Sequence, residues 1–196
     1  SKNLSIINKD KKYFSPSTIS ELKKIIIRNP KSQFLNGGTD LSLIVTKERK
    51  DINTIINLKS IKELDFIKTN NNYIEVGSTT SLIKFENFIL KYYPDFNSIL
   101  KRYGSVQVRN VCSIGGNIAT ASPIGDTLPI LLSLNAEIII QNKVIKKNIP
   151  INKFFKGYRK TILKAGEFIY SIKIPIYKKN IFKAYKISKR FDDDIS

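Results

Sequence analysis

Two pairs of adjacent glycines constrain this chain more than any other feature of its sequence. Four of its nine glycines stand at Gly37–Gly38 and Gly115–Gly116. The first pair follows the apolar run QFL at 33–35 and precedes a stretch that opens like a helix, at Thr39 or Asp40. Glycine tolerates positive φ and lets another group approach the main chain closely. Both pairs therefore predict either a tight turn or a place where a ligand meets the backbone.

The segment FLNGGTD at 34–40 has the physical character of an anion site. Consecutive glycines expose backbone N–H groups, and the start of the following helix adds positive potential. Proteins hold phosphate groups in this way without charged side chains. A plain turn that needs positive φ is the alternative, and the nucleotide-binding motifs GxGxxG and GxxxxGKS/T are both absent.

The segment SIGGNIATASPIGD at 113–126 is predicted to be a second loop of the same kind. Asn117, Thr120 and Ser122 offer hydrogen bonds, and Asp126 offers a carboxylate that accepts from two ligand hydroxyls. Two such loops in one domain predict an elongated ligand that carries phosphates and a polyol, such as a dinucleotide. FAD meets this description, although the residues by themselves specify no single ligand.

Hydrophobic periodicity and turn residues predict an α+β fold. The expected helices are 17–28 with Ser17 as its N-cap, one that opens at Thr39 or Asp40, one that follows the turn at 77–80 and ends at Pro94, 96–104, and 126–133. The expected strands are 33–35, 54–58, one near 64–67, one that begins at 73, a hairpin over 137–149, and the pair 168–175 with 182–188. Residues 154–163 are expected to form a loop or a short helix.

These elements fall into two clusters that divide near residue 60. Residues 1–60 predict a small β-α-β-α-β unit, and residues 61–190 predict a larger unit with more strands. The chain contains no methionine, so we expect it to be an excerpt of a longer polypeptide. No apolar run approaches the roughly 20 residues that span a bilayer, and no secretory signal opens the chain, so no membrane association is expected.

The net charge of +18 raises the question of nucleic-acid binding. Only six of the 34 basic residues are arginine, and the lysines are spread over nearly every expected solvent face. A nucleic-acid surface concentrates arginine with aromatic residues on one face, so solvated faces are the favoured interpretation. A basic surface that docks an acidic partner subunit is a further alternative.

The residue types that the chain lacks narrow its chemistry. With no histidine it has no Ser-His-Asp triad, no imidazole base and no flavin attached through histidine. Its single cysteine makes no intrachain disulfide, zinc site or iron–sulfur cluster, and is compatible with the cytoplasm. If the chain is part of an enzyme, the redox chemistry comes from a bound organic cofactor.

Five motifs, in their order along the chain, resemble those of one family. They are GGTDL at 37–41, VRNVCSIGGNIATASPIGDTLP at 108–129, GYRKT at 157–161, GE-x-I at 166–169 and AYKISKRFDDDIS at 184–196. Together they resemble the FAD-binding domain of molybdenum hydroxylases of the xanthine dehydrogenase type. The resemblance covers essentially the whole chain. It implies a PCMH-type fold in which two α+β subdomains, 1–60 and 61–190, clasp FAD, while residues 191–196 begin a further, absent C-terminal domain.

The resemblance also implies which residues contact FAD, bound noncovalently. The implied set is Phe34, Leu35, Asn36, Gly37, Gly38, Thr39, Asp40 and Leu41 for the pyrophosphate, with Tyr103, Ser113, Gly115, Gly116, Asn117, Thr120, Asp126, Ile169 and Lys186. Tyr103 replaces an aromatic residue that is usually Phe in the family, Ile169 stands for a leucine beside the flavin, and Lys186 stands for a lysine that touches the cofactor.

Each of these weaker assignments has a structural alternative. Tyr103 and Ile169 would serve as core residues, and Lys186 as a solvated strand lysine. Arg109 is expected to cover apolar surface with its aliphatic stem and to play no catalytic part. Cys112 is expected to pack as a small apolar residue.

The function that the resemblance implies is electron relay. Electrons from a molybdopterin site would pass through 2Fe–2S clusters on other domains or subunits to the FAD of this domain, and then to NAD⁺ or oxygen. The resemblance implies a hetero-oligomer with those subunits, and no catalytic or metal-ligating side chain in this domain. A related hydroxylase for an aldehyde, carbon monoxide or another N-heterocycle is the first alternative. A cofactor-free nucleic-acid-binding module is the distant one.

Overall fold

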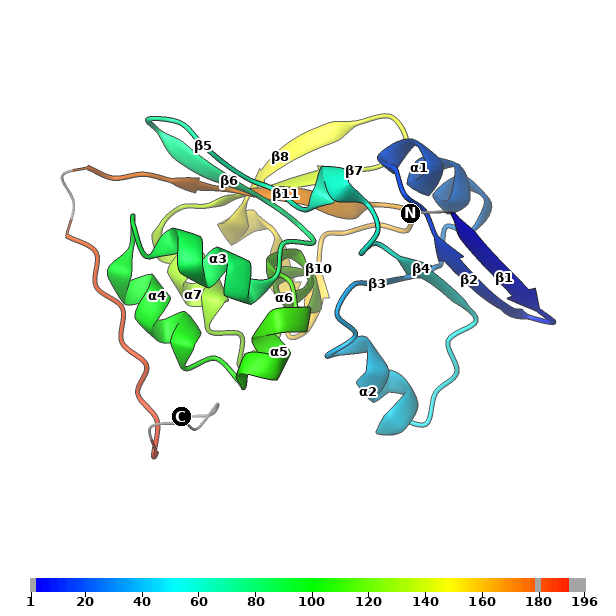
Figure 1. Cartoon of the computed structure of the whole chain (residues 1–196), viewed down its shortest axis with the longest axis horizontal. Coiled ribbons are helices and arrows are strands. Elements are labelled where there is room, and N and C mark those ends of the chain that lie inside the picture. Colours follow the sequence, from blue (N-terminus) through cyan, green and yellow to red (C-terminus); the bar gives the residue numbers. More distant parts are fainter. Residues whose placement is uncertain (1–2, 179–180, 191–196) are drawn as a thin grey trace.

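The computed structural model describes residues 3–178 and 181–190. The described residues contain a four-stranded and a five-stranded sheet with helices packed on each, and a separate two-stranded hairpin (Figure 1). The final segment 191–196, expected to begin a further domain, lies outside the described residues.

The first sheet is formed by residues before position 58. Its strands are β1 (Leu4–Asn8), β2 (Lys11–Ser15), β3 (Gln33–Leu35) and β4 (Thr54–Asn57), in the order β1-β2-β4-β3. β1 and β2 form an antiparallel hairpin, whereas β4 lies parallel to both β2 and β3. Parallel neighbours need crossovers, which are provided by α1 (Ile19–Arg28) and α2 (Leu41–Thr46).

A capping box starts helix α1 one residue later than expected. Thr18, and not Ser17, is the N-cap: its side chain accepts from the N–H of Glu21. The Glu21 carboxylate accepts in return from the backbone N–H groups of Ser17 and Thr18. Leu22 and Ile26 of this helix pack in a small core with Ile56, Leu58, Ile61, Leu64 and Phe168.

The second sheet is antiparallel throughout and has the order β5-β6-β11-β7-β8. Its strands are β5 (Ile67–Thr69), β6 (Tyr73–Gly77), β7 (Glu137–Gln141), β8 (Lys146–Pro150) and β11 (Phe168–Pro175). One face is covered by α3 (Leu82–Ile89), α4 (Pro94–Lys101), α5 (Val106–Val111), α6 (Ile114–Thr120) and α7 (Thr127–Ser133) (Figure 1). Two 3₁₀ turns, η1 (Lys62–Leu64) and η2 (Ile151–Lys153), complete this part.

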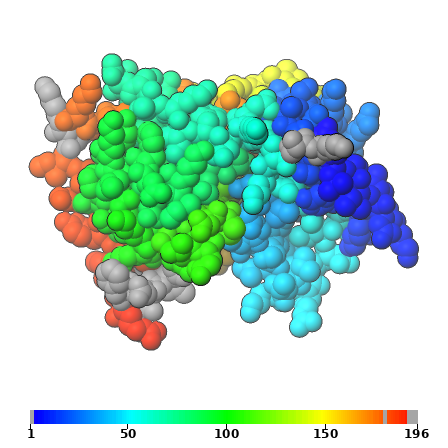
Figure 2. All heavy atoms as spheres, in the orientation of Figure 1, coloured from blue at the N-terminus to red at the C-terminus, as the bar shows by residue number. Residues whose placement is uncertain are grey.

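The larger core lies between this sheet and its helices. The alternating residues Ile74 and Val76 of β6 and Ile172 and Ile174 of β11 face Phe85 and its neighbours on the helices. In the space-filling view, the blue and cyan residues of the first sheet and α2 border the green residues of α3–α5 across the visible face (Figure 2). Phe168 of β11 packs in the small core of the first sheet, so the two parts share buried apolar contacts.

Apart from the segment 113–126, which contains helix α6 (Ile114–Thr120), four predicted elements are wrong in place or type. The strand expected near 64–67 is η1 followed by β5. Pro94 is the first residue of α4 and does not end α3, which stops at Ile89; its missing N–H costs nothing at that position. Residues 154–163 form neither a loop nor a helix throughout, but contain the hairpin β9 (Phe155–Gly157) and β10 (Lys160–Thr161).

The fourth error concerns residues 182–188, which were expected to pair with 168–175. β11 pairs instead with β6 and β7, and residues 182–188 belong to no strand. They run beside α4: the N–H of Ala184 bonds Asp95, and the Phe182 ring lies 5.1 Å from that of Tyr93. The alternating pattern in this segment reflects one face packed on a helix.

Candidate functional site

The two glycine segments meet at the turn between β6 and α3, residues 77–81. Asn36 of the first segment donates from Nδ2 to the carbonyl of Thr79 at 3.4 Å. Gly37 lies against the end of α5, where an added Cβ would stand 2.0 Å from the carbonyl oxygen of Val111. Only glycine allows this approach of two backbones.

The second glycine segment is joined to the same turn from the other side. The N–H of Gly115 donates to the carbonyl of Ser78 at 3.0 Å, and the N–H of Ile114 to that of Thr80 at 3.1 Å. An added Cβ on Gly115 would lie 2.5 Å from Cβ of Ser78. The close approach at Gly37 and at Gly115 is therefore made by the chain's own backbone and side chains.

The second segment was expected to be a loop and is the first part of helix α6. Ser113 is the N-cap, and its hydroxyl accepts from the N–H of Gly116 at 3.2 Å. The Thr120 hydroxyl donates to the carbonyl of Gly116 at 2.9 Å within the same helix. Gly116 itself is exposed, and an added Cβ would meet only the Ser113 hydroxyl, at 3.0 Å.

Gly38 has a different structural reason to be glycine. Its φ is +72°, in the left-handed region that residues with a side chain rarely adopt. It turns the chain from β3 into α2, which begins after Asp40. The two glycine pairs thus combine a close backbone contact (Gly37, Gly115), a left-handed turn (Gly38) and one exposed position (Gly116).

Tyr103, Asn117 and Thr127 form a hydrogen-bonded row that links α6 to the first residue of α7. Asn117 donates from Nδ2 to the Tyr103 hydroxyl at 2.8 Å, and its Oδ1 accepts from the Thr127 hydroxyl. Asn117 and Thr127 are both buried. Because Thr127 donates to the amide oxygen, the Asn117 NH₂ is oriented toward Tyr103, and the row holds the Tyr103 hydroxyl in place.

Asp126 and Lys186, sixty residues apart, form a largely buried ion pair. The distance from Lys186 Nζ to Asp126 Oδ2 is 2.7 Å, and the lysine side chain is 6% exposed. Lys186 also donates to the carbonyl of Arg102 at 3.2 Å, and Arg102 returns a bond to the carbonyl of Lys186 at 2.9 Å. The alternative that Lys186 is a solvated strand lysine is therefore wrong.

The remaining predicted residues lie around this junction. Phe34 packs in the small core, with its ring 6.3 Å from that of Phe168. The carbonyl of Leu35 accepts from the N–H of Leu58, while Thr39 is exposed and Leu41 is the half-buried first residue of α2. Ile169 is buried in the larger core, one residue before Tyr170, whose carbonyl accepts from the N–H of Ser78.

The hairpin β9–β10 reaches the first glycine segment through Asp40. Arg159 Nη1, at the tip of the hairpin, lies 3.3 Å from Asp40 Oδ1. Hydrogen bonding with Tyr158, and then with Asp40, raises the pKa of the Arg159 guanidinium, which stays charged. This contact explains how GYRKT, distant in the sequence, comes to lie beside GGTDL.

Arg109 and Cys112 have structural parts. Arg109 Nε lies 2.9 Å from Glu86 Oε2, both side chains are buried, and the arginine also bonds the carbonyls of Tyr103 and Gly104. The prediction that Arg109 covers apolar surface with its stem therefore left out this buried ion pair and these hydrogen bonds. Cys112 is buried, and this burial raises the pKa of its thiol to about 11.

Sequence reasoning missed two residues of this junction. The hydroxyls of Ser78 and Thr79 are buried and have no hydrogen-bond partner among the described residues. The signal is the run of hydroxyl residues in GSTTS at 77–81, of which 77–80 is predicted only as a turn between a strand and a helix. Ser81 is in fact the N-cap of α3, but Ser78 and Thr79 are not caps.

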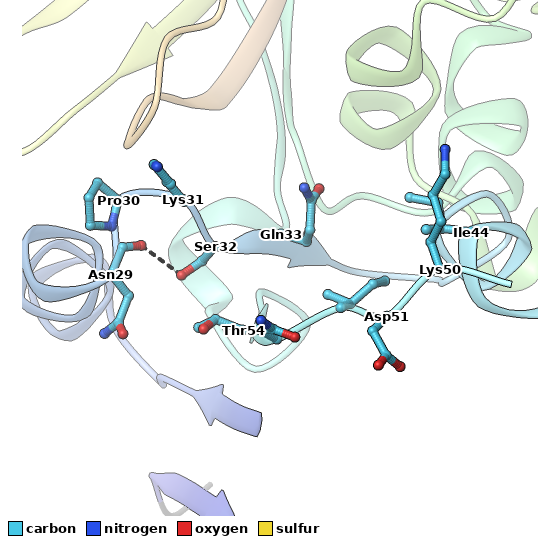
Figure 3. A pocket seen from close by; sticks show the side chains of 11 residues that line it. Asn29, Pro30, Lys31, Ser32, Gln33, Ile44, Lys50, Asp51 and Thr54 are labelled. Atoms are coloured by element: carbon cyan, nitrogen blue, oxygen red, sulfur yellow. Dashed lines mark hydrogen bonds between the residues drawn. The ribbon is translucent and has the colours of Figure 1, made fainter. Parts of the chain in front are cut away.

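A hollow of about 500 Å³ lies elsewhere, between the α1–β3 turn, α2 and residues 50–54 (Figure 3). Its lining includes Lys31, Gln33, Lys50 and Asn53, and none of the predicted cofactor residues. Within residues 3–178 and 181–190 there is no cluster of three or more side chains that would ligate a metal. In that same part of the chain no helix is both long and apolar enough to cross a bilayer.

Comparison with known proteins identifies the family. Residues 7–177 match the family model described as the FAD binding domain in molybdopterin dehydrogenase. The chain belongs to this family. The match confirms the resemblance inferred from GGTDL and the segment 108–129.

Individual molybdopterin dehydrogenases show how far the similarity extends. The chain is 31% identical over 202 residues to xanthine dehydrogenase of Emericella nidulans, covering 96% of this chain and 15% of that protein. It is 28% identical over 190 residues to the nicotinate dehydrogenase FAD-subunit of Eubacterium barkeri, covering 93% and 64%. The chain therefore spans only a small part of the xanthine dehydrogenases that it matches.

The fold is that of a solved carbon monoxide dehydrogenase chain. The structure from Hydrogenophaga pseudoflava superposes with a TM-score of 0.85 at 22% identity, over 96% of this chain and 67% of that one. A quinoline 2-oxidoreductase chain from Pseudomonas putida 86 gives the same score over 93% and 65%. These superpositions confirm the predicted α+β, PCMH-type fold of this FAD-binding domain family.

The residues at the junction fit the cofactor of the family. FAD carries an anionic pyrophosphate, which takes hydrogen bonds from N–H and O–H donors. The junction contains the Ser78 and Thr79 hydroxyls, which have no hydrogen-bond partner among the described residues. It also contains the exposed Gly116, where an added Cβ would meet only the Ser113 hydroxyl. Asp126 and Lys186 add an ion pair at the start of α7.

Proposed function

We propose that this chain is the FAD-binding electron-transfer domain of a xanthine dehydrogenase-type molybdenum hydroxylase. The observation that carries the proposal is the meeting of both glycine segments at the turn 77–81. The family match supports FAD as the ligand, and the 31% identity to a xanthine dehydrogenase supports the type of enzyme.

In this proposal the chain binds and orients the cofactor, and no side chain acts as a general acid or base. Bound FAD supplies the redox chemistry, in which electrons from 2Fe–2S clusters leave to NAD⁺ or oxygen. Residues 34–41 and the first turn of α6 hold the pyrophosphate. Tyr103, held by Asn117, fixes one wall of the site, while Asp126 and Lys186 fix another.

The partners belong to the proposal as well. Molybdopterin and 2Fe–2S clusters would lie on other domains or subunits of a cytoplasmic hetero-oligomer. Within this chain, residues 1–60 and 61–190 act as two subdomains on either side of noncovalently bound FAD. The two sheets support this division, since the first ends at Asn57 and the second begins at Ile67.

A related hydroxylase with another substrate is the second candidate. The nicotinate dehydrogenase FAD-subunit matches 93% of the chain at 28% identity, close to the value for the xanthine dehydrogenases. Since the substrate would bind on another subunit, the FAD domain alone does not distinguish these candidates.

The proposal is tested on the purified chain in two steps. The first is titration with FAD, followed by flavin fluorescence; we expect saturable one-to-one binding and a flavin absorption band near ~450 nm in the complex. The second is anaerobic mixing of the complex with NADH, with NADPH as the control; bleaching by NADH supports NAD⁺ as the acceptor. A chain that binds no FAD, yet binds DNA with a steep salt dependence, contradicts the proposal.

The enzyme type needs the complete complex. The chain carrying an affinity tag is purified from its source with its partner subunits, and xanthine, nicotinate and an aldehyde are offered as substrates. Reduction of the bound flavin by xanthine alone supports the first candidate. Reduction by nicotinate or the aldehyde alone supports the second.

A further inference from the structure

We propose that the hydroxyls of Ser78 and Thr79 are ligands of the FAD pyrophosphate and form a third wall between the two glycine segments. The inference rests on the proposed location of FAD at the junction of those segments. No motif of the family resemblance includes these two residues.

Both side chains are held where solvent hardly reaches them. Ser78 is 5% exposed and Thr79 is 9% exposed. Neither hydroxyl has a hydrogen-bond partner among the described residues. A buried hydroxyl without a partner costs about 1–3 kcal/mol, so two adjacent ones in one turn need an explanation.

The backbone of these two residues, in contrast, is fully engaged. The N–H of Ser78 donates to Tyr170 of β11, and its carbonyl accepts from Gly115, both at 3.0 Å. The N–H of Thr79 donates to Leu64 at 3.0 Å, and its carbonyl accepts from Asn36. Hydrogen bonds to four segments thus fix the backbone of the turn. The two side-chain hydroxyls take no part in holding it.

The next residue shows how a structural hydroxyl behaves in the same turn. Thr80 is completely buried, and its hydroxyl donates to the carbonyl of Phe66 at 3.1 Å. The turn therefore has a partner for the hydroxyl that serves the fold. Ser78 and Thr79 have none, which points to a ligand from outside the chain.

The position of the turn indicates which part of the ligand they meet. The Ser78 carbonyl bonds Gly115 and the Thr79 carbonyl bonds Asn36, so the turn that carries the two hydroxyls lies between the two segments assigned to the pyrophosphate. A phosphate oxygen accepts from a hydroxyl in a charge-assisted hydrogen bond, which is about twice as strong as a neutral one. Two hydroxyl donors with the nearby glycine backbone make a suitable anion cradle.

The test compares Ser78→Ala and Thr79→Val with Thr80→Val as the matched control. We expect the first two variants to raise the Kd for FAD about tenfold each, because each loses one charge-assisted hydrogen bond. Their unfolding temperature without FAD should be unchanged or higher, since each substitution removes a buried hydroxyl that lacks a partner. Thr80→Val should lower that temperature and leave the Kd within about twofold.

Two further measurements separate the alternatives. Thr79→Ser keeps the hydroxyl and should bind FAD like the wild type, which excludes a pure size effect. ADP, which carries the pyrophosphate, should lose affinity in the same variants, whereas riboflavin, which has no phosphate, should not. A loss confined to riboflavin would assign the hydroxyls to the polyol and overturn the inference.

The inference and the proposed function fail in different ways. If the wild type binds FAD and Ser78→Ala and Thr79→Val bind it equally well, the inference is wrong while the proposed function stands. If these variants lose stability and affinity together, as a structural hydroxyl would require, the inference is also wrong. If the wild type binds no FAD, the proposed function is overturned and the inference with it.

Discussion

Lys186 and Asp126 lie 2.7 Å apart between Nζ and Oδ2, although sixty residues separate them in the chain. The pair joins the extended segment 181–188 to the start of α7. Arg102 strengthens the junction, because its guanidinium bonds the carbonyl of Lys186 and the hydroxyl of Ser188. Two residues that sequence patterns assign separately to the cofactor thus act on each other.

Removal of either charge should destabilise the chain more than a surface pair would. Asp126→Ala leaves the buried Lys186 ammonium without its carboxylate, and we expect a loss of about 2–4 kcal/mol in the free energy of unfolding. Urea denaturation measures it. The exposed pair Lys183–Asp95, at 3.6 Å, is the control, and Lys183→Ala should cost less than about 1 kcal/mol. Equal losses in the two variants would contradict the buried character of the first pair.

The glycines should separate into structural and ligand-facing positions. Gly37→Ala and Gly115→Ala place a Cβ 2.0 Å from the Val111 carbonyl oxygen and 2.5 Å from Ser78 Cβ, so we expect losses of roughly 3 kcal/mol or more, or failure to fold. Gly116→Ala meets only the Ser113 hydroxyl and gains helix propensity, so stability should change by less than about 1 kcal/mol.

FAD affinity is the second measurement that separates ligand-facing glycines from structural ones. If the pyrophosphate approaches the first turn of α6, Gly116→Ala and the bulkier Gly116→Val should weaken FAD binding progressively in fluorescence titrations. Unchanged affinity in both variants would show that the cofactor does not come close to Gly116. Gly38 is a poorer probe, because its φ of +72° makes any substitution strained.

Replacing only one partner of the buried ion pair Glu86–Arg109 should lower the free energy of unfolding strongly. Both side chains are under 10% exposed, and Arg109 also holds the carbonyls of Tyr103 and Gly104. Arg109→Met leaves the Glu86 carboxylate buried and unpaired, and we expect a loss of about 3–5 kcal/mol. Thermal and urea unfolding of Arg109→Met, Glu86→Gln and the double variant measure the coupling. A double variant whose loss equals the sum of the single losses would show that the two side chains do not interact.

The Cys112 thiol should make stability depend on alkaline pH. Burial raises its pKa in the folded chain to about 11, while an exposed cysteine in the unfolded chain titrates near ~8.5. The unfolded chain therefore loses this proton first, so the contribution is fully present below about pH 8.5 and is lost as pH rises through 11. Its size is roughly 3 kcal/mol.

A comparison with Cys112→Ala isolates this effect. Tyr93 and Tyr170, whose pKa values are also raised by burial, titrate in both proteins, so the difference in unfolding free energy between them reports Cys112. We expect the wild type to lose stability relative to the alanine variant as the pH rises from about 8 to about 11.5. A difference that is constant with pH would contradict a buried neutral thiol.

Helices and strands that are determined by residues close together in the sequence agree with the predictions. Helix α1 has its cap, its acidic first turn and its apolar face within eleven residues, so only the identity of the cap is off by one. The strand runs at 137–141 and 168–175 are long and apolar enough to be unambiguous, and both form central strands of the second sheet. The positions of Phe85 and Ile89 follow from helical spacing, and both are buried.

Elements decided by distant neighbours do not follow the local patterns. Alternation at 182–188 is equally consistent with a strand and with a chain packed on a helix, and the packing of Phe182 and Ala184 beside α4 selects the second. Pro94 is compatible with the end of one helix or the start of the next. The hairpin at 155–161 has weak strand character, and its tip is held by Arg159 against Asp40, from 119 residues away.

The sequence by itself determined the α+β class, most of the regular elements and the two glycine segments, because capping, turn formation and amphipathic spacing depend on residues a few positions apart. The tertiary structure alone decided why each glycine is needed. It placed Gly37 against Val111, and Gly115 against a turn whose Ser78 and Thr79 hydroxyls are otherwise without a partner. Such contacts depend on how segments 37 to 74 residues apart pack together, and no local pattern encodes that packing.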